Sequence, residues 1–374
     1  MEILEHMGAD GHEQLVVVSD AGSGLKAIIA IHDTTLGPAC GGTRIWPYMS
    51  EQEAVWDALR LSRAMTYKSA AADLPLGGGK GVIIADSHND KTEALIRAYG
   101  RFVDTLGGRY LTTTDVGTTG RDMEYIKQET DYVVGLPTTA GGSGDTSIMT
   151  GLGLYMGMKA CAKEVWGSDS LTGKTVAMQG FGKVASHTAH HLMKEDAKLV
   201  VTDVFEGALD GAHDLGLMVV KSDDIYDVEC DIFSPCALGG VINPNTIPRL
   251  KCNIVAGGAN NQLLAESDGE ELHRLGIVYG PDYVLNSGGV INVESEITGE
   301  YSSERAREKT ERIYEIMGRV ISVSKTEEIT TAEAADRLAE DRLKSVREIR
   351  QILSLIHISA PTRLGMLSYA VFCL

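Results

Sequence analysis

Two lysines and one aspartate supply the first chemistry that the sequence suggests. Lys68 ends an expected helix, Lys80 follows the run Leu76–Gly79, and Asp115 lies in the string TTTDVGTT after a β-rich run. A lysine that lies beside another cation and away from water loses its proton more readily, and it can then act as a base near neutral pH. A carboxylate beside two ammonium groups can transfer protons. The three residues therefore predict general acid–base chemistry, with a solvated loop lysine and a turn aspartate as the plainer alternatives.

The glycines before Lys80 point to a small ligand rather than to a nucleotide phosphate. A Walker A loop needs serine or threonine after its lysine, and Gly81 occupies that position here. The run 77–81 is therefore expected to be a loop whose backbone approaches a small ligand closely. A short strand is expected directly after it, over 82–85.

A second pattern, GxGxxA, follows an expected strand at 174–179 and begins an expected helix. Gly180 permits a tight turn, Gly182 lets the backbone approach a pyrophosphate, and Ala185 lets helix and strand pack closely. The next strand ends at Asp203, whose carboxylate can bond ribose hydroxyls and would repel a 2′-phosphate. The pattern predicts NAD binding by a helix N-terminus, with a tight turn in a protein that binds no dinucleotide as the alternative. The residues concerned are Gly180, Phe181, Gly182, Lys183, Val184, Ala185 and Asp203.

Polar and small residues follow two further expected strands. The segment Ser234–Leu238 contains Ala237, and the segment Ala256–Gln262 contains Asn260 and Asn261. Residues at the carboxyl ends of parallel strands line the crevice of an open sheet. The asparagine amides could bind a nicotinamide amide or a substrate carboxylate, and a turn role for each asparagine is equally open.

The elements that would position these residues alternate along the chain. Strands are expected at 14–19, 25–32 and 110–113, a helix that Ser50 and Glu53 cap at 50–68, and another helix near 92–106. A boundary is expected in 136–147, followed by a helix at 150–165 and by repeated strand–helix alternation to about residue 293. The segment 303–352 reads as helical, with its last helix beginning at Thr331 near Glu333. Such alternation predicts an α/β fold with a parallel sheet.

The composition excludes several classes of partner. The formal net charge is −18, which gives no electrostatic footprint for nucleic acid or an anionic membrane. There is no apolar run of about 18 residues and no signal-like N-terminus, so a cytoplasmic protein is expected. None of the six cysteines forms CxxC, and they are expected to be reduced thiols with no metal site.

The stretch 353–374, LSLIHISAPTRLGMLSYAVFCL, differs from the rest of the chain. It is apolar, nearly uncharged and follows a charged helical segment. It resembles translated adapter DNA, and we treat it as a non-native tail; a genuine apolar C-terminal arm is the alternative.

Taken together, the motifs resemble those of the leucine/phenylalanine/valine dehydrogenases, a branch of the glutamate dehydrogenase superfamily. The strings that carry the resemblance span the chain up to about residue 350 and are SGLKAIIAIHDTTLGPACGGTR, AMTYKSAAADLPLGGGKGVII, TTTDVGTT, QGFGKVA, VTD, PCALGGVIN, GGANNQL and PDYVLNSGGVINV. The resemblance implies two domains separated by a cleft. One is an α/β catalytic and oligomerisation domain (1–140), and the other is a Rossmann NAD-binding domain (141–325). A C-terminal helix (326–352) would return to the first domain, and a homo-oligomer, an octamer by resemblance, is expected.

The resemblance also implies roles for the residues of the first domain. Lys68 would bind the substrate carboxylate together with the backbone of Gly41 and Gly42. Lys80 would activate the water that attacks an imine, and Asp115 would transfer the proton at the amino group. In the implied reaction NAD accepts hydride from the amino-acid Cα, and the addition of water then releases ammonia and a 2-oxo acid.

The residues expected at the nicotinamide are Thr150 and Asn260, with Asn261 beside them at the substrate. Lys183 stands where asparagine is frequent, and it could add a phosphate contact.

Substrate preference depends on the residues around the side chain of the amino acid. Glutamate-specific relatives carry a lysine where this chain has Cys40, so glutamate would bury an unpaired charge and is disfavoured. Val290 matches the leucine type, whereas Thr113 matches neither the leucine nor the phenylalanine type. We expect branched-chain aliphatic L-amino acids as substrates. Phenylalanine remains an alternative, and so does a homologue that binds NAD without turnover. The expected side-chain pocket comprises Cys40, Met65, Thr113, Val290 and Val293.

Overall fold

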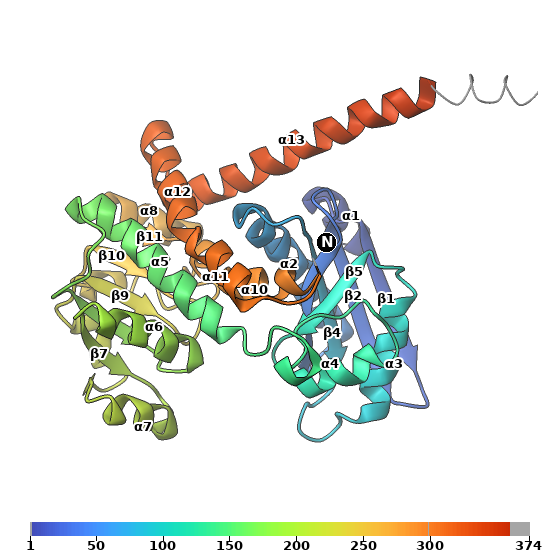
Figure 1. The fold of residues 1–374 in the computed structure, drawn as a ribbon, viewed down its shortest axis with the longest axis horizontal. Helices are drawn as coiled ribbons and strands as arrows, with labels where there is room; N and C mark the ends of the chain where they lie inside the picture. The colour runs from blue at the N-terminus through green and yellow to red at the C-terminus, as the bar shows by residue number, and fades with distance from the viewer. Residues whose placement is uncertain (1, 298, 360–374) are drawn as a thin grey trace, which may run out of the picture.

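In the computed structural model the chain forms two α/β lobes, which Figure 1 shows side by side. The structure describes residues 2–297 and 299–359, with side chains up to residue 349. Of the expected non-native tail, residues 360–374 lie outside the described part. No helix within the described residues is long and apolar enough to cross a membrane.

The first lobe is built on a five-stranded sheet in the order β1-β2-β4-β3-β5. β1 and β2 run antiparallel to their neighbours, whereas β3 runs parallel to both β4 and β5. Helix α2 packs on one face through Ala54, Ala58 and Leu59, and α3 and α4 cover the other. The elements are α1 Ile3–Asp10, β1 Gln14–Asp20, β2 Leu25–Asp33, β3 Ala39–Trp46, α2 Glu51–Ala71, β4 Gly77–Ile84, α3 Glu93–Asp104, β5 Tyr110–Thr114 and α4 Gly120–Lys127.

The second lobe is built on a six-stranded sheet in the order β11-β10-β9-β6-β7-β8, and all its strand pairs are parallel. Short buried strands of β-branched residues and helices on both faces are what the sequence pattern predicts. The strands are β6 Thr175–Gln179, β7 Lys198–Thr202, β8 Met218–Val219, β9 Ile232–Pro235, β10 Ile254–Ala256 and β11 Val278–Gly280. The helices are α5 Ser147–Trp166, α6 Lys183–Lys194, α7 Glu206–Asp214, α8 Glu266–Arg274, α9 Asp282–Leu285, α10 Gly288–Ile297, α11 Ser303–Glu311, α12 Ile313–Glu327 and α13 Thr331–Ser359.

The expected glycine loop at 77–81 is wrong, because these residues form the first part of strand β4. A Cβ on Gly78 would lie 2.2 Å from the backbone nitrogen of Thr66, and a Cβ on Gly79 would lie 2.6 Å from the ring of Tyr110. The glycines therefore let α2 and the ring of Tyr110, from β5, pack directly onto β4. They are needed for packing within the protein rather than for binding a ligand. Lys80 lies in the same buried strand.

Strand β3 was not expected from the sequence, although it lies between β4 and β5. Its glycines give it little β propensity. A Cβ on Gly41 would lie 1.7 Å from the carbonyl oxygen of Gly79, so only glycine allows this approach of neighbouring strands.

The helix starts are largely as expected. The hydroxyl of Ser50 accepts a hydrogen bond from the amide of Glu53, which begins α2. The segment 303–352 is helical, as α11, α12 and α13. The cap of α13 is Thr330 rather than Thr331: its hydroxyl accepts from the amide of Glu333, whose carboxylate accepts from the amide of Thr330.

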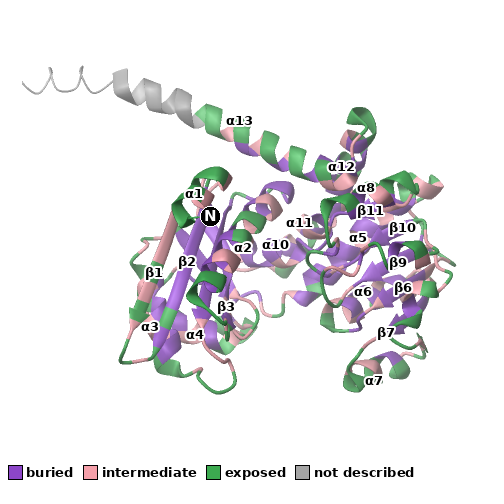
Figure 2. Cartoon of the chain, turned by 180° about the vertical axis from the view of Figure 1, so that it is seen from behind, coloured by how far each residue is buried: buried purple, intermediate pink, exposed green. Residues whose placement is uncertain are grey.

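Helix α13 connects the two lobes. It starts beside β11 in the second lobe, packs against α12, and crosses to α2 in the first lobe. Figure 2 shows that the sheets of both lobes are largely buried, whereas one side of α13 is exposed. In the sequence, the strands of the first sheet precede the segment 136–147 and those of the second sheet follow it. The domain limits given above stay a prediction.

A cluster of buried histidines holds α1 against the first lobe. His32 bonds to the hydroxyl of Thr66 at 2.8 Å and to the carbonyl of Asp10 at 2.9 Å, and His12 bonds to the carbonyl of Leu59 at 2.9 Å. The two imidazole rings lie 4.7 Å apart. Burial lowers the pKa of His32 to about 4 and also lowers the pKa of His12. Both rings are therefore neutral in the folded protein at physiological pH.

This cluster predicts a loss of stability in acid. An unfolded histidine takes up a proton as the pH falls below about 6.5, whereas folded His32 resists protonation until about pH 4. Between pH 7.5 and 5 the free energy of unfolding should fall by about 2 kcal/mol from His32 alone. Urea unfolding at the two pH values measures this difference. In a His32→Gln variant the difference should shrink, and an undiminished difference would assign the acid sensitivity to other groups.

Candidate active site

A cavity of about 480 Å³ lies between the two lobes, with walls from both. The residues expected from the sequence that line it are Cys40, Gly42, Met65, Lys68, Lys80, Thr113, Asp115, Thr150, Val184, Asn260, Asn261, Val290 and Val293. Gly41 lies in β3 next to Gly42. Gly180, Phe181, Gly182, Lys183, Ala185, Asp203 and Ala237 lie around the β6–α6 turn of the second lobe rather than in the walls of this cavity.

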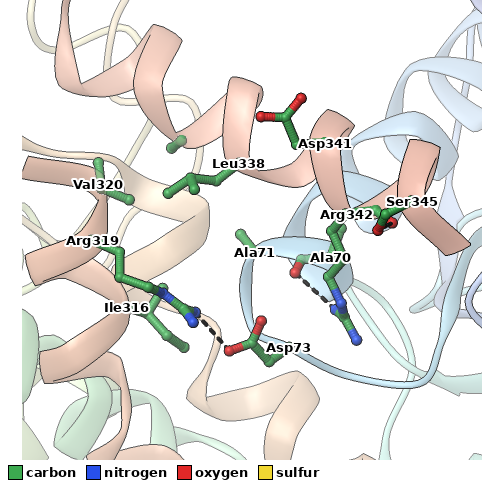
Figure 3. A pocket seen from close by; sticks show the side chains of 11 residues that line it. Ala70, Ala71, Asp73, Ile316, Arg319, Val320, Leu338, Asp341, Arg342 and Ser345 are labelled. Atoms are coloured by element: carbon green, nitrogen blue, oxygen red, sulfur yellow. Dashed lines mark hydrogen bonds and ion pairs between the residues drawn. The ribbon is translucent and has the colours of Figure 1, made fainter. Parts of the chain in front are cut away.

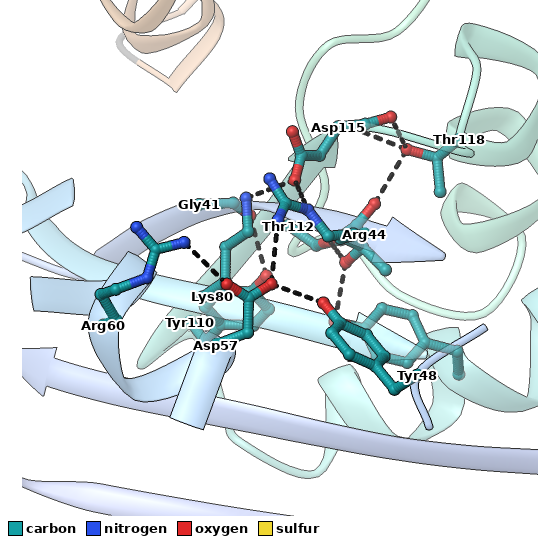
Figure 4. Close-up of polar contacts among 12 residues, drawn as sticks. Gly41, Arg44, Tyr48, Asp57, Arg60, Lys80, Tyr110, Thr112, Asp115 and Thr118 are labelled. Atoms are coloured by element: carbon teal, nitrogen blue, oxygen red, sulfur yellow. Dashed lines mark hydrogen bonds and ion pairs between the residues drawn. The ribbon is translucent and has the colours of Figure 1, made fainter. Parts of the chain in front are cut away.

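Three neighbouring elements bring the acid–base residues together. Lys68 comes from the last turn of α2, Lys80 from β4, and Asp115 from the residue after β5. The ammonium of Lys80 donates to Asp115 Oδ2 at 2.5 Å, as Figure 4 shows. The side chain of Lys80 is 7% exposed. The side chain of Asp115 is 22% exposed, so the pair is partly shielded from water and its charges interact more strongly than at an open surface.

Arg44 is a second cation bonded to Asp115, and the sequence analysis did not identify it. Its Nε donates to Asp115 Oδ2 at 3.1 Å, and its Nη1 donates to Asp57 Oδ2 at 2.8 Å. Burial alone would raise the pKa of Asp115, but Lys80 and Arg44 outweigh burial and the pKa is lowered. Asp115 is thus held as a carboxylate.

Asp57 in turn holds Arg44 in place. Asp57 accepts hydrogen bonds from Tyr48 at 2.5 Å and from Arg60 at 2.8 Å, in addition to the bond from Arg44 (Figure 4). The network links strand β3, the start of α2 and the end of β5, so the position of Asp115 depends on elements far apart in the sequence.

Lys68 is in a different electrostatic state from Lys80. Burial lowers the pKa of Lys68 to about 8, Lys80 adds to this effect, and Asp282 and Asp115 oppose it. No side chain among the described residues hydrogen-bonds to its ammonium group. The sequence suggested the crowded, dry environment for Lys80, whereas the structure pairs Lys80 with Asp115 and leaves Lys68 able to receive an anion.

The cavity wall around the expected side-chain pocket is mainly apolar. Cys40 is 0%, Val293 2% and Val290 7% exposed, and Met65 completes this wall. The hydroxyl of Thr113 has no hydrogen-bond partner and packs against Gly135, where an added Cβ would lie 2.4 Å from it. A charged substrate side chain would find no partner among these five residues.

The β6–α6 turn has the features of a dinucleotide site. Gly180 has a φ of 98°, and a Cβ there would lie 2.7 Å from that of Ala237. A Cβ on Gly182 would meet no atom within 4 Å, so open space adjoins the first amides of α6, which no side chain caps. Asp203 lies at the end of β7 and accepts from the amide of Phe181 at 2.7 Å. These residues fit the pyrophosphate and ribose of a dinucleotide.

Lys183 is the exception in this turn. Its ammonium pairs with Asp145 at 2.9 Å and its side chain is 77% exposed. Because the pair is exposed, the ammonium is accessible to a phosphate.

Two residues of the cavity were missed in the sequence, although both lie in the string PDYVLNSGG. Asn286 donates to Asn260 Oδ1 at 2.8 Å, while its own Oδ1 is buried without a partner. Asp282 accepts from the amides of Asn261 and Tyr283, and burial raises its pKa. Nothing in their local pattern distinguishes them from ordinary turn residues.

Comparison with known proteins agrees with this arrangement. Residues 12–132 match the model of the Glu/Leu/Phe/Val dehydrogenase dimerisation domain, and residues 141–215 and 206–350 match that of the Glutamate/Leucine/Phenylalanine/Valine dehydrogenase family. Leucine dehydrogenase of Geobacillus stearothermophilus is 55% identical over 94% of this chain and 95% of the relative. Phenylalanine dehydrogenase of Lysinibacillus sphaericus is 49% identical over 89% of each. The crystal structure of L-tryptophan dehydrogenase from Nostoc punctiforme superposes with a TM-score of 0.81 at 45% identity, covering 92% of this chain and 100% of that one.

The network around Asp115 predicts how stability responds to substitution. Arg44→Met should lower the free energy of unfolding by roughly 2–4 kcal/mol, because it leaves two half-buried carboxylates short of a counter-charge. Adding Asp115→Asn should recover part of that loss, since one uncompensated charge disappears. Thermal or urea unfolding of the single and double variants measures the coupling. Arg60→Met is the control: it removes an exposed arginine from Asp57 and should cost less than about 1 kcal/mol.

Proposed function

The chain belongs to the glutamate/leucine/phenylalanine/valine dehydrogenase family, and we propose that it oxidatively deaminates branched-chain aliphatic L-amino acids with NAD. As a member of this family it is an amino-acid dehydrogenase. The observation that carries the finer proposal is the cleft itself. Lys68, which has no hydrogen-bond partner among the described residues, lies near the Lys80–Asp115 pair and an apolar wall.

Lys68 binds the carboxylate of the amino acid in this proposal. An ammonium group in a poorly hydrated cleft gains more from a carboxylate than it would in water. Gly42 lines the same cavity, and the backbone of Gly41 and Gly42 would orient the same group. Binding of the anion favours the protonated form of Lys68.

Lys80 and Asp115 carry out the proton transfers. The ammonium proton of Lys80 first passes to Asp115, and the neutral amine of Lys80 then removes a proton from the water that attacks the imine carbon. Asp115 passes its proton on to the amino nitrogen, which leaves as ammonia. The lowered pKa of Asp115 keeps it ionised and ready to accept the proton of Lys80. The walls of the cleft limit access of bulk water to these steps.

NAD is the proposed cofactor, and when bound it supplies the acceptor for the hydride of the substrate Cα. The open space beside Gly182 and the uncapped start of α6 support a pyrophosphate there. Asp203 would bond the ribose hydroxyls, and Phe181, Lys183, Val184, Ala185 and Ala237 would adjoin the dinucleotide. Asn286, with its unpartnered buried oxygen, joins Thr150 and Asn260 as a proposed contact of the nicotinamide carboxamide.

Leucine, valine and isoleucine are the proposed substrates. Cys40, Val290 and Val293 offer no counter-charge for glutamate, whose carboxylate would be costly to bury. Leucine dehydrogenases of 53–55% identity support the aliphatic choice. Phenylalanine is the second candidate, because Cys40 leaves room in the pocket and one methylene changes binding by only about 1–3 kcal/mol.

Assembly and location are also proposals. The matched dimerisation domain supports a homo-oligomer, for which an octamer is our expectation. Five cysteines are free in the described part of the chain, which suits a reducing, cytoplasmic setting.

NADH formation at alkaline pH with L-leucine, L-valine, L-isoleucine, L-phenylalanine and L-glutamate tests the proposal. The branched aliphatic substrates should give the highest kcat/KM and glutamate the lowest. Highest turnover with phenylalanine would keep the chemistry and overturn the pocket assignment. No turnover on any substrate by a protein that binds NADH would favour a non-catalytic homologue.

Substitution of the proton-transfer pair should abolish turnover and spare the cofactor site. Lys80→Ala and Asp115→Asn should each lower kcat by about 100-fold or more. NADH binding, followed by fluorescence titration, should stay within twofold of the parent. Lys127→Ala, which removes an exposed lysine on α4, is the matched control, and its kcat should not change. A substantial kcat in Lys80→Ala would remove this residue from the mechanism.

Asp203→Ala should weaken the discrimination between NAD and NADP. The carboxylate that bonds the ribose and repels a 2′-phosphate is then gone, so the ratio of the two kcat/KM values should fall about tenfold or more. Asp214→Ala, an exposed aspartate at the end of α7, serves as control. An unchanged ratio in Asp203→Ala would place the discrimination elsewhere.

A further inference from the structure

The last turn of α2 carries Lys68 and has an unusual end. The helix stops at Ala71 without a glycine, and Asp73 takes the left-handed conformation with a φ of 57°. The last carbonyl groups of a helix have no partner inside it and carry a partial negative charge. The amides of Ala72, Asp73 and Leu74 bond to three of them, and a cation outside α2 can add further bonds that hold this end, and with it Lys68, in one position.

Arg342 of α13 supplies these further bonds. Its Nη1 donates to the carbonyl oxygens of Ser69 at 3.2 Å and Ala70 at 2.8 Å, and its Nη2 donates to that of Leu74 at 2.8 Å. Figure 3 shows the guanidinium lying against the end of α2. A cation at a helix C-terminus is favoured by the helix dipole, and the planar guanidinium can bridge several acceptors at once.

A second contact from α13 acts on the other side of Lys68. The hydroxyl of Tyr67 donates to Glu340 Oε1 at 3.0 Å. Between these polar contacts Ala70, Ala339 and Leu343 form a small buried cluster, with 2%, 0% and 6% exposure. The residues on both sides of Lys68 are thus bound to α13.

The start of α13 is bound to the opposite wall of the cleft. Thr331 donates to the carbonyl of Tyr279 at 2.6 Å, and the hydroxyl of Tyr283 donates to Asp336 at 2.6 Å. Tyr283 and its neighbour Asp282 line the cavity, and Asp282 interacts electrostatically with Lys68. One helix therefore connects both walls around the Lys68 ammonium.

A cavity lies beside Arg342, but the arginines that line it already bond to groups of the protein and are not needed for a ligand. This cavity of about 370 Å³ lies among α2, α12 and α13. Its two arginines already have partners in the protein, since Arg319 pairs with Asp73 at 2.6 Å and Arg342 bonds the end of α2 (Figure 3).

We propose that Arg342, assisted by Glu340, is a positioning residue that holds Lys68 for the substrate carboxylate. The inference rests on the proposed role of Lys68. Arg342 touches neither substrate nor cofactor, and it acts by fixing the last turn of α2. Loss of Arg342 lets this turn relax toward solvent and moves the ammonium from its place in the cleft.

The test compares Arg342→Met with the parent in the full chain. The KM for L-leucine should rise about tenfold, while kcat and the KM for NAD stay within about threefold. The inhibition constant of 4-methylpentanoate, which has the carbon skeleton and carboxylate of leucine but no amine, should rise by the same factor. Arg342→Lys, which keeps one cationic donor, should restore part of the affinity.

The matched control is Arg347→Met on the same helix. Arg347 pairs with Asp33 at 2.5 Å and ties α13 to the first lobe away from Lys68. This variant should change neither KM nor inhibition constant by more than twofold. Equal effects of Arg342→Met and Arg347→Met would overturn the inference, because they would show only a general loosening of α13.

A double-variant cycle separates this inference from the proposed function. If Arg342 acts through Lys68, adding Arg342→Met to Lys68→Ala should not weaken 4-methylpentanoate binding further, and an additive loss would overturn the inference. If Lys68→Ala itself leaves binding unchanged, the proposed role of Lys68 fails instead. Should Arg342→Met not fold, Glu340→Gln, with an expected two- to threefold rise in KM, takes its place in the same cycle.

Discussion

Lys80 and Asp115 meet at 2.5 Å in a cleft that partly shields them from water, and the charges of this pair must be balanced by the residues around it. Burial disfavours an isolated carboxylate, so Asp115 requires both Lys80 and Arg44. Asp57 pairs with Arg44 and also accepts hydrogen bonds from Tyr48 and Arg60. The network ties β3, α2, β4 and the end of β5 into one unit. Much of the first lobe can be understood as the support that keeps one ion pair in place.

The division of labour between the two lysines follows from the same electrostatics. Lys80 has a fixed partner, whereas Lys68 is partly buried near a like charge and has no hydrogen-bond partner among the described residues. A paired lysine and an unpaired lysine suit different tasks: one exchanges protons within a fixed geometry and the other receives an anionic ligand. The apolar wall of Cys40, Val290 and Val293 then decides which side chain can accompany that anion.

The two lobes contribute to the site unequally but are joined by one element. The second lobe supplies the β6–α6 turn and Asp203, and the first supplies the charged residues. Helix α13 begins beside β11 of the second lobe and crosses to α2 of the first, where it contacts the residues on both sides of Lys68. In our proposal, a segment far from the chemistry in sequence influences the geometry of substrate binding.

The sequence by itself determined the features that depend only on residues close together in the chain. The GxGxxA turn, the Ser50 cap and the strand–helix alternation were predictable because each depends on residues a few positions apart. The glycines of β4, strand β3, and the roles of Arg44, Asn286 and Arg342 were not, because each depends on a neighbour far away in the chain. Position 78 requires glycine because Thr66 packs against it. Among the described residues, Asp115 pairs with Lys80, and Lys68 is left without a hydrogen-bond partner. Such contacts exist only once the chain has folded, since burial and distance, not residue type, set the charge state of each group.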